Sequence, residues 1–335
     1  CGIAGILARR RVNKQAVKAM TDQMHHRGPD GEGIWESSDG RIILGHRRLA
    51  IIDPTPAGSQ PMVSDDGDYI LTFNGEIYNY LELATHLKTL GRKFKSKSDS
   101  EVLLQGYAEE CEGILKSLNG MFAFVIYDAR RKKLFCARDR FGEKPFLYVH
   151  SPDFFAFASE YKALFSLAEV NRGIEIERLL TFLHEPRLGL EDERETVFKS
   201  IRQLLPGEYL TIDTMSFEIK VERYWSLEKK EEFEGLQIDE AANQFKSLLS
   251  DSIKIRMRSD VPVGSCLSGG LDSASIVCLN RETLGPLENY NVFTGRFPDT
   301  KSDEWKYARE IIKATHVRSH VVTPSPVGFL AELPD

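Results

Sequence analysis

The 335-residue chain has few cysteines, no long apolar run and no large excess of one charge. Its five cysteines are scattered and form no Cys-x-x-Cys pair, so neither a disulfide framework nor a zinc site is predicted. The four internal cysteines have apolar neighbours, and we expect them to be small buried side chains. They are Cys111, Cys136, Cys266 and Cys278, while the fifth, Cys1, opens the chain.

No apolar run approaches the roughly 20 residues that span a bilayer. The first ten residues also lack the long apolar core and the small-residue cleavage site of a signal peptide. Lys and Arg number 44 against 50 Asp and Glu, a net charge of −6, which argues against nucleic acid or an anionic membrane as the main partner. We therefore predict a cytoplasmic protein with neither kind of partner, and with enough residues for two domains.

The first half of the chain consists of short strand candidates rich in Ile, Val, Phe and Tyr and bounded by turn residues. These candidates are residues 40–53, 68–79, 120–128, 133–142, 154–160 and 207–214. Two helices are predicted among them, over about 78–90 and over 98–110, where Ser98 or Asp99 can cap the helix. Many strands with helices between them favour an α+β sandwich, in which helices pack on antiparallel sheets.

Around residues 226–238 the sequence becomes charged and poor in strand formers, as linkers often are. The long helix predicted after it has an apolar face formed by Ala242, Phe245, Leu249 and Ile253. Strand and helix candidates then alternate, which indicates a parallel α/β sheet. Because only three strands are available, we expect an incomplete sheet with poorly covered edges. The predicted domains are 1–228 and 237–335, joined by a linker over 229–236.

A glycine-rich segment, Ser-Gly-Gly-Leu-Asp-Ser from Ser268 to Ser273, lies between an apolar strand and a helix. Consecutive glycines let backbone N–H groups turn toward one point, and the helix adds the positive end of its dipole, so the segment predicts a phosphate site. It has neither the Gly-Lys-Ser/Thr of a Walker A loop nor Gly-x-Gly-x-x-Gly spacing. Asp272 can hold magnesium, which takes carboxylate and phosphate oxygens. The alternative is a tight strand-to-helix turn.

This segment resembles the signature of the ATP pyrophosphatases, which cleave ATP between the α and β phosphates. Some of those enzymes also have an amino-terminal glutamine-hydrolysing domain whose nucleophile is residue 1. A cysteine in that position brings its own base, because an α-amine with a pKa near 7.7–8.0 is partly neutral at pH 7 and can take the thiol proton. The alternative is that trimming of methionine left Cys1 at the terminus without a role.

Other segments supply candidates for substrate contacts. Asn74 and Gly75, in the segment Phe-Asn-Gly-Glu-Ile-Tyr-Asn, can donate to a developing oxyanion, and Glu76 can accept from a substrate ammonium. Arg48 can hold a carboxylate through two hydrogen bonds, and Asp99 can pair with an α-amino group. Each of these residues alone also fits a turn, a solvated side chain or a helix cap.

Taken in order, the motifs resemble the class II glutamine amidotransferases, and in particular the glutamine-dependent asparagine synthetases. The motifs are CGIAGI, HRGPDGEG, RLAIID, AGSQPM, FNGEIYN, SDSEV, DRFGEKPFLY, FASEYKAL, VFKSIRQLLPGEYL, YW, SGGLDS and SDEWKYARE. The resemblance covers nearly the whole chain. It implies an α+β amino-terminal-nucleophile sandwich followed by an incomplete α/β ATP-pyrophosphatase domain.

The resemblance implies a role for each matched residue. Cys1 is the implied nucleophile, and Asn74 with Gly75 forms the implied oxyanion hole. The implied glutamine site consists of Arg48, Leu49, Ala50, Ile51, Ile52, Asn74, Gly75, Glu76 and Asp99. The implied ATP site consists of Leu267, Ser268, Gly269, Gly270, Leu271, Asp272 and Ser273, with Thr294 contacting adenine through its backbone.

The implied reaction has two halves. Cys1 releases ammonia from glutamine through a thioester, while magnesium-ATP adenylates the side-chain carboxylate of aspartate, which ammonia then converts to asparagine. The implied partners are therefore L-glutamine, L-aspartate, ATP and Mg²⁺. The sequence leaves the oligomeric state open, with a homodimer as one alternative.

The end of the chain departs from the family pattern. Family members continue well past the region matched by residues 321–335, with a second ATP loop and aspartate-binding residues. We therefore expect a fragment, or a chain completed by another, that keeps glutamine hydrolysis and makes little asparagine. Three alternatives stay open: a related ligase acting on a different carboxylate, an amide hydrolase without a synthetase step, and a binding module whose sites have decayed.

Overall fold

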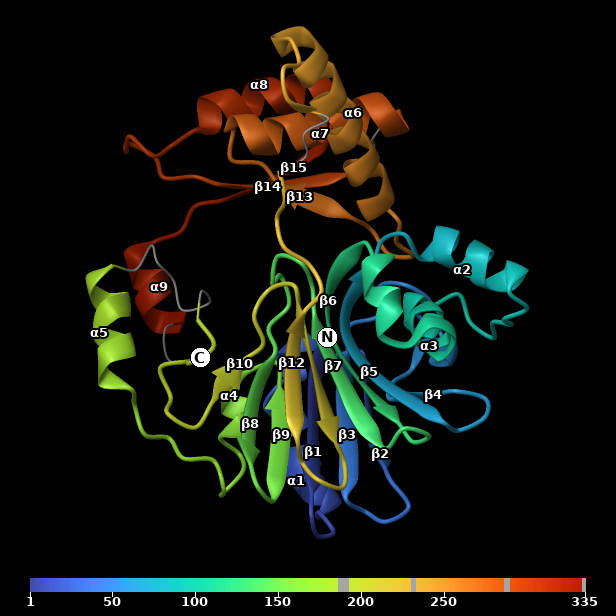
Figure 1. Cartoon of the computed structure of the whole chain (residues 1–335). Coiled ribbons are helices and arrows are strands. Elements are labelled where there is room, and N and C mark those ends of the chain that lie inside the picture. Colours follow the sequence, from blue (N-terminus) through green and yellow to red (C-terminus); the bar gives the residue numbers. More distant parts are fainter. Residues whose placement is uncertain (186–192, 230–232, 286–289, 333–335) are drawn as a thin grey trace. The chain divides into compact units, whose positions relative to one another are not determined.

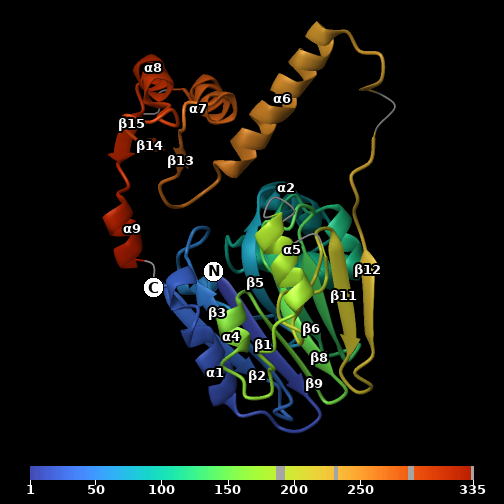
Figure 2. The same ribbon diagram turned by 90° about the vertical axis from the view of Figure 1, so that its left-hand side faces the viewer.

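The computed structural model describes residues 1–185, 193–229, 233–285 and 290–332 (Figures 1 and 2). The chain divides into two compact units, Cys1–Glu228 and Lys229–Asp335, each described here by itself. Residues 230–232 of the predicted linker lie outside the described residues. In the described part of the chain, no helix combines the length and apolarity needed to cross a membrane.

The first unit is built on two six-stranded antiparallel sheets. One sheet has the strand order β10-β8-β9-β1-β3-β2, and the other has the order β12-β11-β7-β6-β5-β4. The strands of the first sheet are β1 (Gly2–Ala8), β2 (Gly31–Glu36), β3 (Ile42–Arg48), β8 (Leu147–Ser151), β9 (Phe154–Ala158) and β10 (Arg202–Gln203). Those of the second are β4 (Met62–Val63), β5 (Tyr69–Ile77), β6 (Gly120–Asp128), β7 (Lys133–Arg138), β11 (Glu208–Asp213) and β12 (Ile219–Arg223). Each of the six candidate segments contains one of these strands.

Several helices accompany the two sheets of the first unit. They are α1 (Lys14–Asp22), α2 (Tyr80–Thr89), α3 (Asp99–Glu110), α4 (Tyr161–Leu164) and α5 (Ile176–His184), with short 3-10 helices at His25–Arg27, Pro56–Gly58 and Cys111–Lys116. Helices α2 and α3 match the two predicted segments. Ser98 caps α3, since its side chain accepts a hydrogen bond from the amide of Ser100 at 3.2 Å.

Three apolar clusters make the first unit a four-layer sandwich. The middle cluster fills the space between the two sheets, with Leu44 and Phe157 from one sheet and Val125 and Leu210 from the other. A second cluster packs α1 and α4 on the first sheet. A third packs α3 on the second sheet through Tyr107 and its neighbours. The core therefore supports both sheets from both sides, and this fixes the strand ends from which the site is built.

The second unit has a small parallel sheet in the order β13-β14-β15, with both strand pairs parallel. Its elements are α6 (Ile238–Arg256), β13 (Gly264–Cys266), α7 (Leu271–Leu284), β14 (Asn291–Gly295), α8 (Trp305–Thr315), β15 (Arg318–Val322) and α9 (Pro326–Glu332). Its core joins Leu267 and Val292 of the sheet region to Val277 of α7 and Ala308 of α8. On α6, Phe245 of the predicted apolar face is 67% exposed, whereas Ile253 is buried.

The prediction that all four internal cysteines are buried is wrong for three of them. Cys136 is buried, Cys111 is half-buried, and Cys266 and Cys278 are exposed. Cys266 is paired with the exposed Phe293, so it belongs to the sheet face opposite the buried cluster. Cys278 follows a buried position on α7, and one residue of a helix turns the next side chain by about 100°. Apolar neighbours in sequence therefore did not indicate burial here.

Candidate active site

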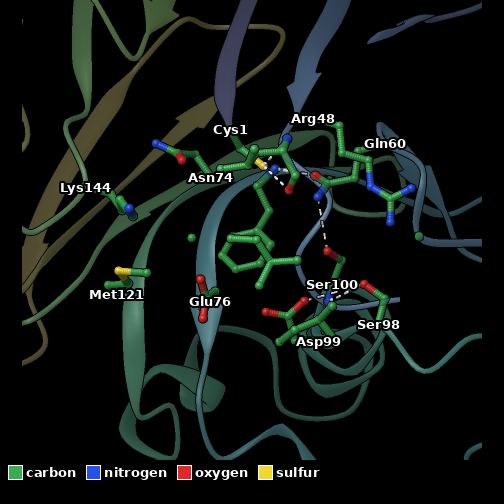
Figure 3. Close-up of a pocket in the computed structure, with 16 residues that line it drawn as sticks. Cys1, Arg48, Gln60, Asn74, Glu76, Ser98, Asp99, Ser100, Met121 and Lys144 are labelled. Atoms are coloured by element: carbon green, nitrogen blue, oxygen red, sulfur yellow. Dashed lines mark hydrogen bonds between the residues drawn. The ribbon is translucent and has the colours of Figure 1, made fainter. Parts of the chain in front are cut away.

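All but one of the residues predicted to form the glutamine site meet at one pocket in the first unit (Figure 3). Strands β1 and β3 are neighbours in one sheet, and β5 belongs to the facing sheet. The His46 ring nitrogen Nε2 lies 3.0 Å from the carbonyl of Phe73, which joins β3 to β5. The pocket is lined by Cys1, Arg48, Leu49, Ile51, Ile52, Gly58, Gln60, Phe73, Asn74, Gly75, Glu76, Ser98, Asp99, Ser100, Met121 and Lys144.

The α-amine of Cys1 is a neutral base at physiological pH. Burial, together with the positive charges of Lys144 and Arg27, lowers its pKa from 8.0 to about 5, while Glu76 and Asp30 act in the opposite direction. A neutral amine has a lone pair that can take the proton of the thiol on the same residue. The site thus places a thiol and a basic amine on a single residue.

The thiol of Cys1 is held beside the end of β3. Its Sγ lies 3.3 Å from the amide nitrogen of Leu49, which donates to it, and 3.5 Å from the carbonyl oxygen of the same residue. A backbone donor at the sulfur favours its thiolate form. The contact also fixes the direction from which the sulfur can attack a carbonyl in the pocket.

Asn74 and Gly75 place two donors at the same point of β5. The Asn74 side chain is 1% exposed, and its Nδ2 has no hydrogen-bond partner among the described residues. A buried donor without a partner costs about 1–3 kcal/mol, so its retention points to a ligand that accepts from it. Gly75 runs close to β6: a Cβ added there would lie 2.1 Å from the carbonyl oxygen of Met121. Only glycine fits this approach.

Two carboxylates lie on the opposite side of the pocket from the sulfur (Figure 3). Burial raises the pKa of Asp99 to about 7, and the charge of Glu76 adds to this shift, although the Ile77 amide donates to Asp99 Oδ2 at 2.9 Å. Burial also raises the pKa of Glu76, against the positive charge of Lys144. A cationic group placed between the two carboxylates would favour the ionised form of both.

Arg48 forms the wall beside the turn that follows β3. Its guanidinium donates to the carbonyl of Thr55 at 2.8 Å and to that of Asp53. A Cβ added to Gly58 would lie 2.2 Å from Arg48 Nη2, so the guanidinium packs directly on the glycine backbone. These carbonyl contacts hold the charged group at the wall of the pocket, where a guanidinium can bind a carboxylate through two hydrogen bonds.

One predicted glutamine-site residue lies outside the set that lines the pocket. The amide of Ala50 donates to Asp30 Oδ2 at 2.9 Å, which turns the backbone at that point, whereas its neighbours Leu49 and Ile51 reach the pocket. Gln60, Ser100 and Lys144 line the pocket but received no role from the sequence. Their motifs were recognised, but only the three-dimensional pairing of distant segments brings them to Cys1.

The predicted phosphate loop connects β13 to α7 as expected. Gly269 has a φ of +98°, and a Cβ there would lie 2.8 Å from the carbonyl oxygen of Glu304, so glycine is required. The hydroxyls of Ser268 and Ser273 lie 3.0 Å apart, and the amide of Gly270 donates to Ser268 Oγ at 3.2 Å. The loop is therefore a tight turn with its own internal hydrogen bonds, immediately before a helix amino terminus.

The other predicted ATP residues differ in exposure. Leu267 is buried in the core of the second unit, and the buried Thr294 donates through Oγ1 to its carbonyl at 2.8 Å. Asp272 is exposed in the first turn of α7, and Leu271 is 82% exposed. Among the described residues, no three carboxylate, histidine or cysteine side chains gather into a metal site. A single carboxylate suits a Mg²⁺ ion that arrives bound to nucleotide phosphates.

Comparison with known families agrees with this geometry. A glutamine amidotransferase domain model matches residues 1–225, and an asparagine synthase model matches residues 244–335. The putative asparagine synthetase (glutamine-hydrolyzing) 2 of Methanocaldococcus jannaschii is 37% identical over 321 residues, which cover 90% of this chain and 61% of that protein. Asparagine synthetase (glutamine-hydrolyzing) 3 of Bacillus subtilis is 35% identical over 87% of this chain and 48% of its own length.

A solved structure resembles the fold at low sequence identity. The glutamine phosphoribosylpyrophosphate amidotransferase of B. subtilis gives a TM-score of 0.51 at 18% identity, over 97% of this chain and 82% of that one. Antiparallel sheets with helices, followed by a small parallel sheet, are thus confirmed as the fold class. They define an amino-terminal-nucleophile amidotransferase fold.

The chain belongs to the glutamine amidotransferase family, and its second region matches the asparagine synthases. It spans about half the length of the curated relatives it matches.

Proposed function

We propose that the first unit hydrolyses L-glutamine to glutamate and ammonia with Cys1 as the nucleophile. The observation that carries this proposal is the meeting of two groups in one pocket: a buried neutral amine on Cys1, and the unpartnered amide of Asn74. The Cys1 amine is a base beside a thiol, and the Asn74 amide is a hydrogen-bond donor that can bind an acceptor on the substrate. Acyl transfer to sulfur needs both.

The chemistry proceeds in two steps. The α-amine of Cys1 takes the thiol proton as the sulfur adds to the carbon of the side-chain amide. Asn74 Nδ2 and the Gly75 amide stabilise the oxyanion, and the amine returns its proton to the departing nitrogen, which leaves as ammonia. Water then attacks the thioester through the same oxyanion, releasing glutamate and restoring the thiol. The protein supplies the proton transfer and the charge stabilisation without any further group.

Recognition of the amino-acid end of glutamine falls to three charged residues of the same pocket. Arg48 binds the α-carboxylate, since backbone carbonyls hold its guanidinium at the wall of the pocket. Asp99 and Glu76 bind the α-ammonium, whose charge favours the ionised form of both carboxylates. Placement of the substrate at both ends directs its side-chain amide toward the sulfur.

We further propose that ammonia serves an ATP-dependent amidation in the longer protein, with L-aspartate as the acceptor and asparagine as the product. The support is the asparagine synthase match to the second unit and the names of the relatives. In this proposal the loop from Ser268 to Ser273 binds the nucleotide together with Leu267 and Thr294, and Asp272 contributes to Mg²⁺ bound by the phosphates. The test is whether the longer protein converts aspartate, ATP and glutamine into asparagine and AMP.

The glutaminase is tested by the intact mass of the protein after treatment with the glutamine-analogue electrophile 6-diazo-5-oxo-norleucine. We expect one stoichiometric adduct, which peptide mapping places on Cys1, together with loss of glutamate release from glutamine. Cys1→Ser removes both signals, while Cys266→Ser, which changes an exposed cysteine of the other unit, leaves both intact. An adduct on an internal cysteine, or none at all, would contradict the proposal.

A further inference from the structure

We propose that Lys144 is an electrostatic positioning residue for glutamine hydrolysis, whose ammonium acts on both the Cys1 amine and the Glu76 carboxylate across the pocket. This inference rests on the proposed function. Lys144 lines the pocket together with both groups (Figure 3). It comes from the loop between β7 and β8, an element that the glutamine contacts predicted from the sequence do not include.

The loop that carries Lys144 is anchored to a buried carboxylate. Asp139 is 1% exposed, and its two oxygens accept four backbone hydrogen bonds. The donors are the amides of Phe122 at 3.1 Å, Phe141 at 3.0 Å, Glu143 at 2.9 Å and Lys144 at 3.0 Å. Three of them belong to the loop itself, so Asp139 organises it as a cap organises a helix end. The backbone at Lys144 is therefore set by the core of the unit.

A buried guanidinium holds the same loop through its carbonyls. Arg138 is 1% exposed and donates to the carbonyls of Lys144, Gly142 and Leu204, each at 2.8 Å. A charged group this deep in the protein is costly unless its donors are satisfied, and here they bond to the loop carbonyls of Gly142 and Lys144 and to the carbonyl of Leu204. Two buried charged side chains, Arg138 and Asp139, thus hold the backbone of residues 138–144 in one conformation. An exposed surface lysine would need no such support.

The positive charge of Lys144 lowers the pKa of both groups, which favours the neutral form of the amine and the charged form of the carboxylate. It is the largest charged contribution that lowers the pKa of the Cys1 amine, ahead of Arg27, while Glu76 and Asp30 raise it. It also lowers the pKa of Glu76 against the effect of burial. One cation therefore favours a base without its proton and a carboxylate with its charge, which are the two states that the proposed reaction needs.

The other charged and titratable groups near the amine do not duplicate this role. Arg27 forms an ion pair with Glu160, which His26 Nε2 also contacts at 2.8 Å, so part of the positive charge is already offset. His46 is buried with its pKa lowered to about 3, and it is neutral at working pH. Lys144 is thus the group whose removal should change the protonation of the Cys1 amine most.

The test is the pH dependence of glutamine hydrolysis in Lys144→Met and Lys144→Arg. We expect Lys144→Met to move the acid limb of kcat/KM to higher pH, with a loss of at least about threefold at pH 6 that shrinks toward pH 9. Lys144→Arg keeps the charge and should restore the wild-type limb. The rate of Cys1 modification by 6-diazo-5-oxo-norleucine should shift in the same way. A lysine with a purely structural role would lower activity equally at all pH values.

The matched control is Lys93→Met, which removes the same charge from an exposed position of the same unit. Thermal unfolding shows whether Lys144→Met is folded, and Lys144→Gln repeats the test with a polar side chain. If both neutral variants have the same pH profile as an active wild type, the inference is wrong but the proposed glutaminase stands. An equal shift in Lys93→Met also overturns it. A wild type that releases no glutamate overturns the proposed function and the inference together.

Discussion

Asp99 is a residue whose place in the proposed function conflicts with its contribution to stability. Its pKa is raised from 3.8 to about 7 by burial. Below about pH 4 the carboxyl is protonated in both the folded and the unfolded chain. As the pH rises from 4 to 7 the unfolded chain releases this proton and the folded one keeps it, so the free energy of unfolding falls. Above pH 7 the cost is complete, on the order of 4 kcal/mol.

We therefore predict that Asp99→Asn raises the melting temperature of the substrate-free protein at pH 8 by roughly 4 °C or more and leaves it unchanged at pH 4. The amide oxygen of asparagine can still accept from Ile77, so the fold is kept. Activity should fall at the same time through a higher KM, because the substrate ammonium loses a partner. Asp66→Asn is the control: its pKa is lowered, first by the Ser64 hydroxyl, so the sign should be reversed. An equal gain at pH 4 and pH 8 would contradict the argument.

At the residue scale, much of the candidate site could be predicted from the sequence. Cys1, Arg48, Asn74 and Asp99 line one pocket although they lie far apart along the chain. Motif order carried that prediction, because each residue type is required by the chemistry. Lys144 could not be predicted in the same way. Its role depends on the field that it exerts on Cys1, and this is set by how the loop after β7 folds back.

At the scale of elements, the pairing of β5 with β6 leaves no room for a side chain at Gly75, one of the two proposed oxyanion donors. A Cβ at this position would lie 2.1 Å from the Met121 carbonyl oxygen and 2.7 Å from the Cα of Phe122. We predict that Gly75→Ala separates β5 from β6, costs about 2–4 kcal/mol in the free energy of unfolding and lowers kcat more than tenfold. Chemical denaturation and a glutaminase assay measure both effects.

Gly113→Ala is the matched control for that variant. A Cβ at Gly113 would lie 3.7 Å from the Cβ of Glu110, an ordinary contact, so stability and activity should change little. If Gly75→Ala were as stable and as active as Gly113→Ala, close approach of β6 would not be the reason for glycine at this position.

Some elements could be predicted from the sequence, and others could not. β5 and β6 are long and rich in β-branched and aromatic residues, so their pattern is plain. β1, with the sequence Gly-Ile-Ala-Gly-Ile-Leu-Ala, was not predicted as a strand. It is buried on both faces, so apolar and polar residues do not alternate along it. On the neighbouring β3, a Cβ at Gly45 would lie 2.7 Å from Thr21 of α1, so small residues here reflect close helix packing.

At the scale of the whole molecule, the two units have separate cores. The three clusters of the sandwich contain residues of Cys1–Glu228 only, and the fourth cluster belongs wholly to the second unit. In the second unit, one face of the sheet bears Cys266 and the 48%-exposed Phe293, so among the described residues its apolar surface is only partly covered. The first unit therefore has a much more extensive apolar core of its own than the second unit.

We therefore predict that residues 1–228 produced alone fold cooperatively and hydrolyse glutamine at a rate within about twofold of the 335-residue chain. All the residues that line the glutamine pocket lie in this unit, and so do the Asp139 and Arg138 contacts that support Lys144. ATP should leave its rate unchanged, and Cys1→Ser in the same shortened chain is the inactive control. A shortened chain that melts with normal cooperativity but is inactive would mean that the second unit completes the glutamine site, even though none of the residues lining the pocket comes from it.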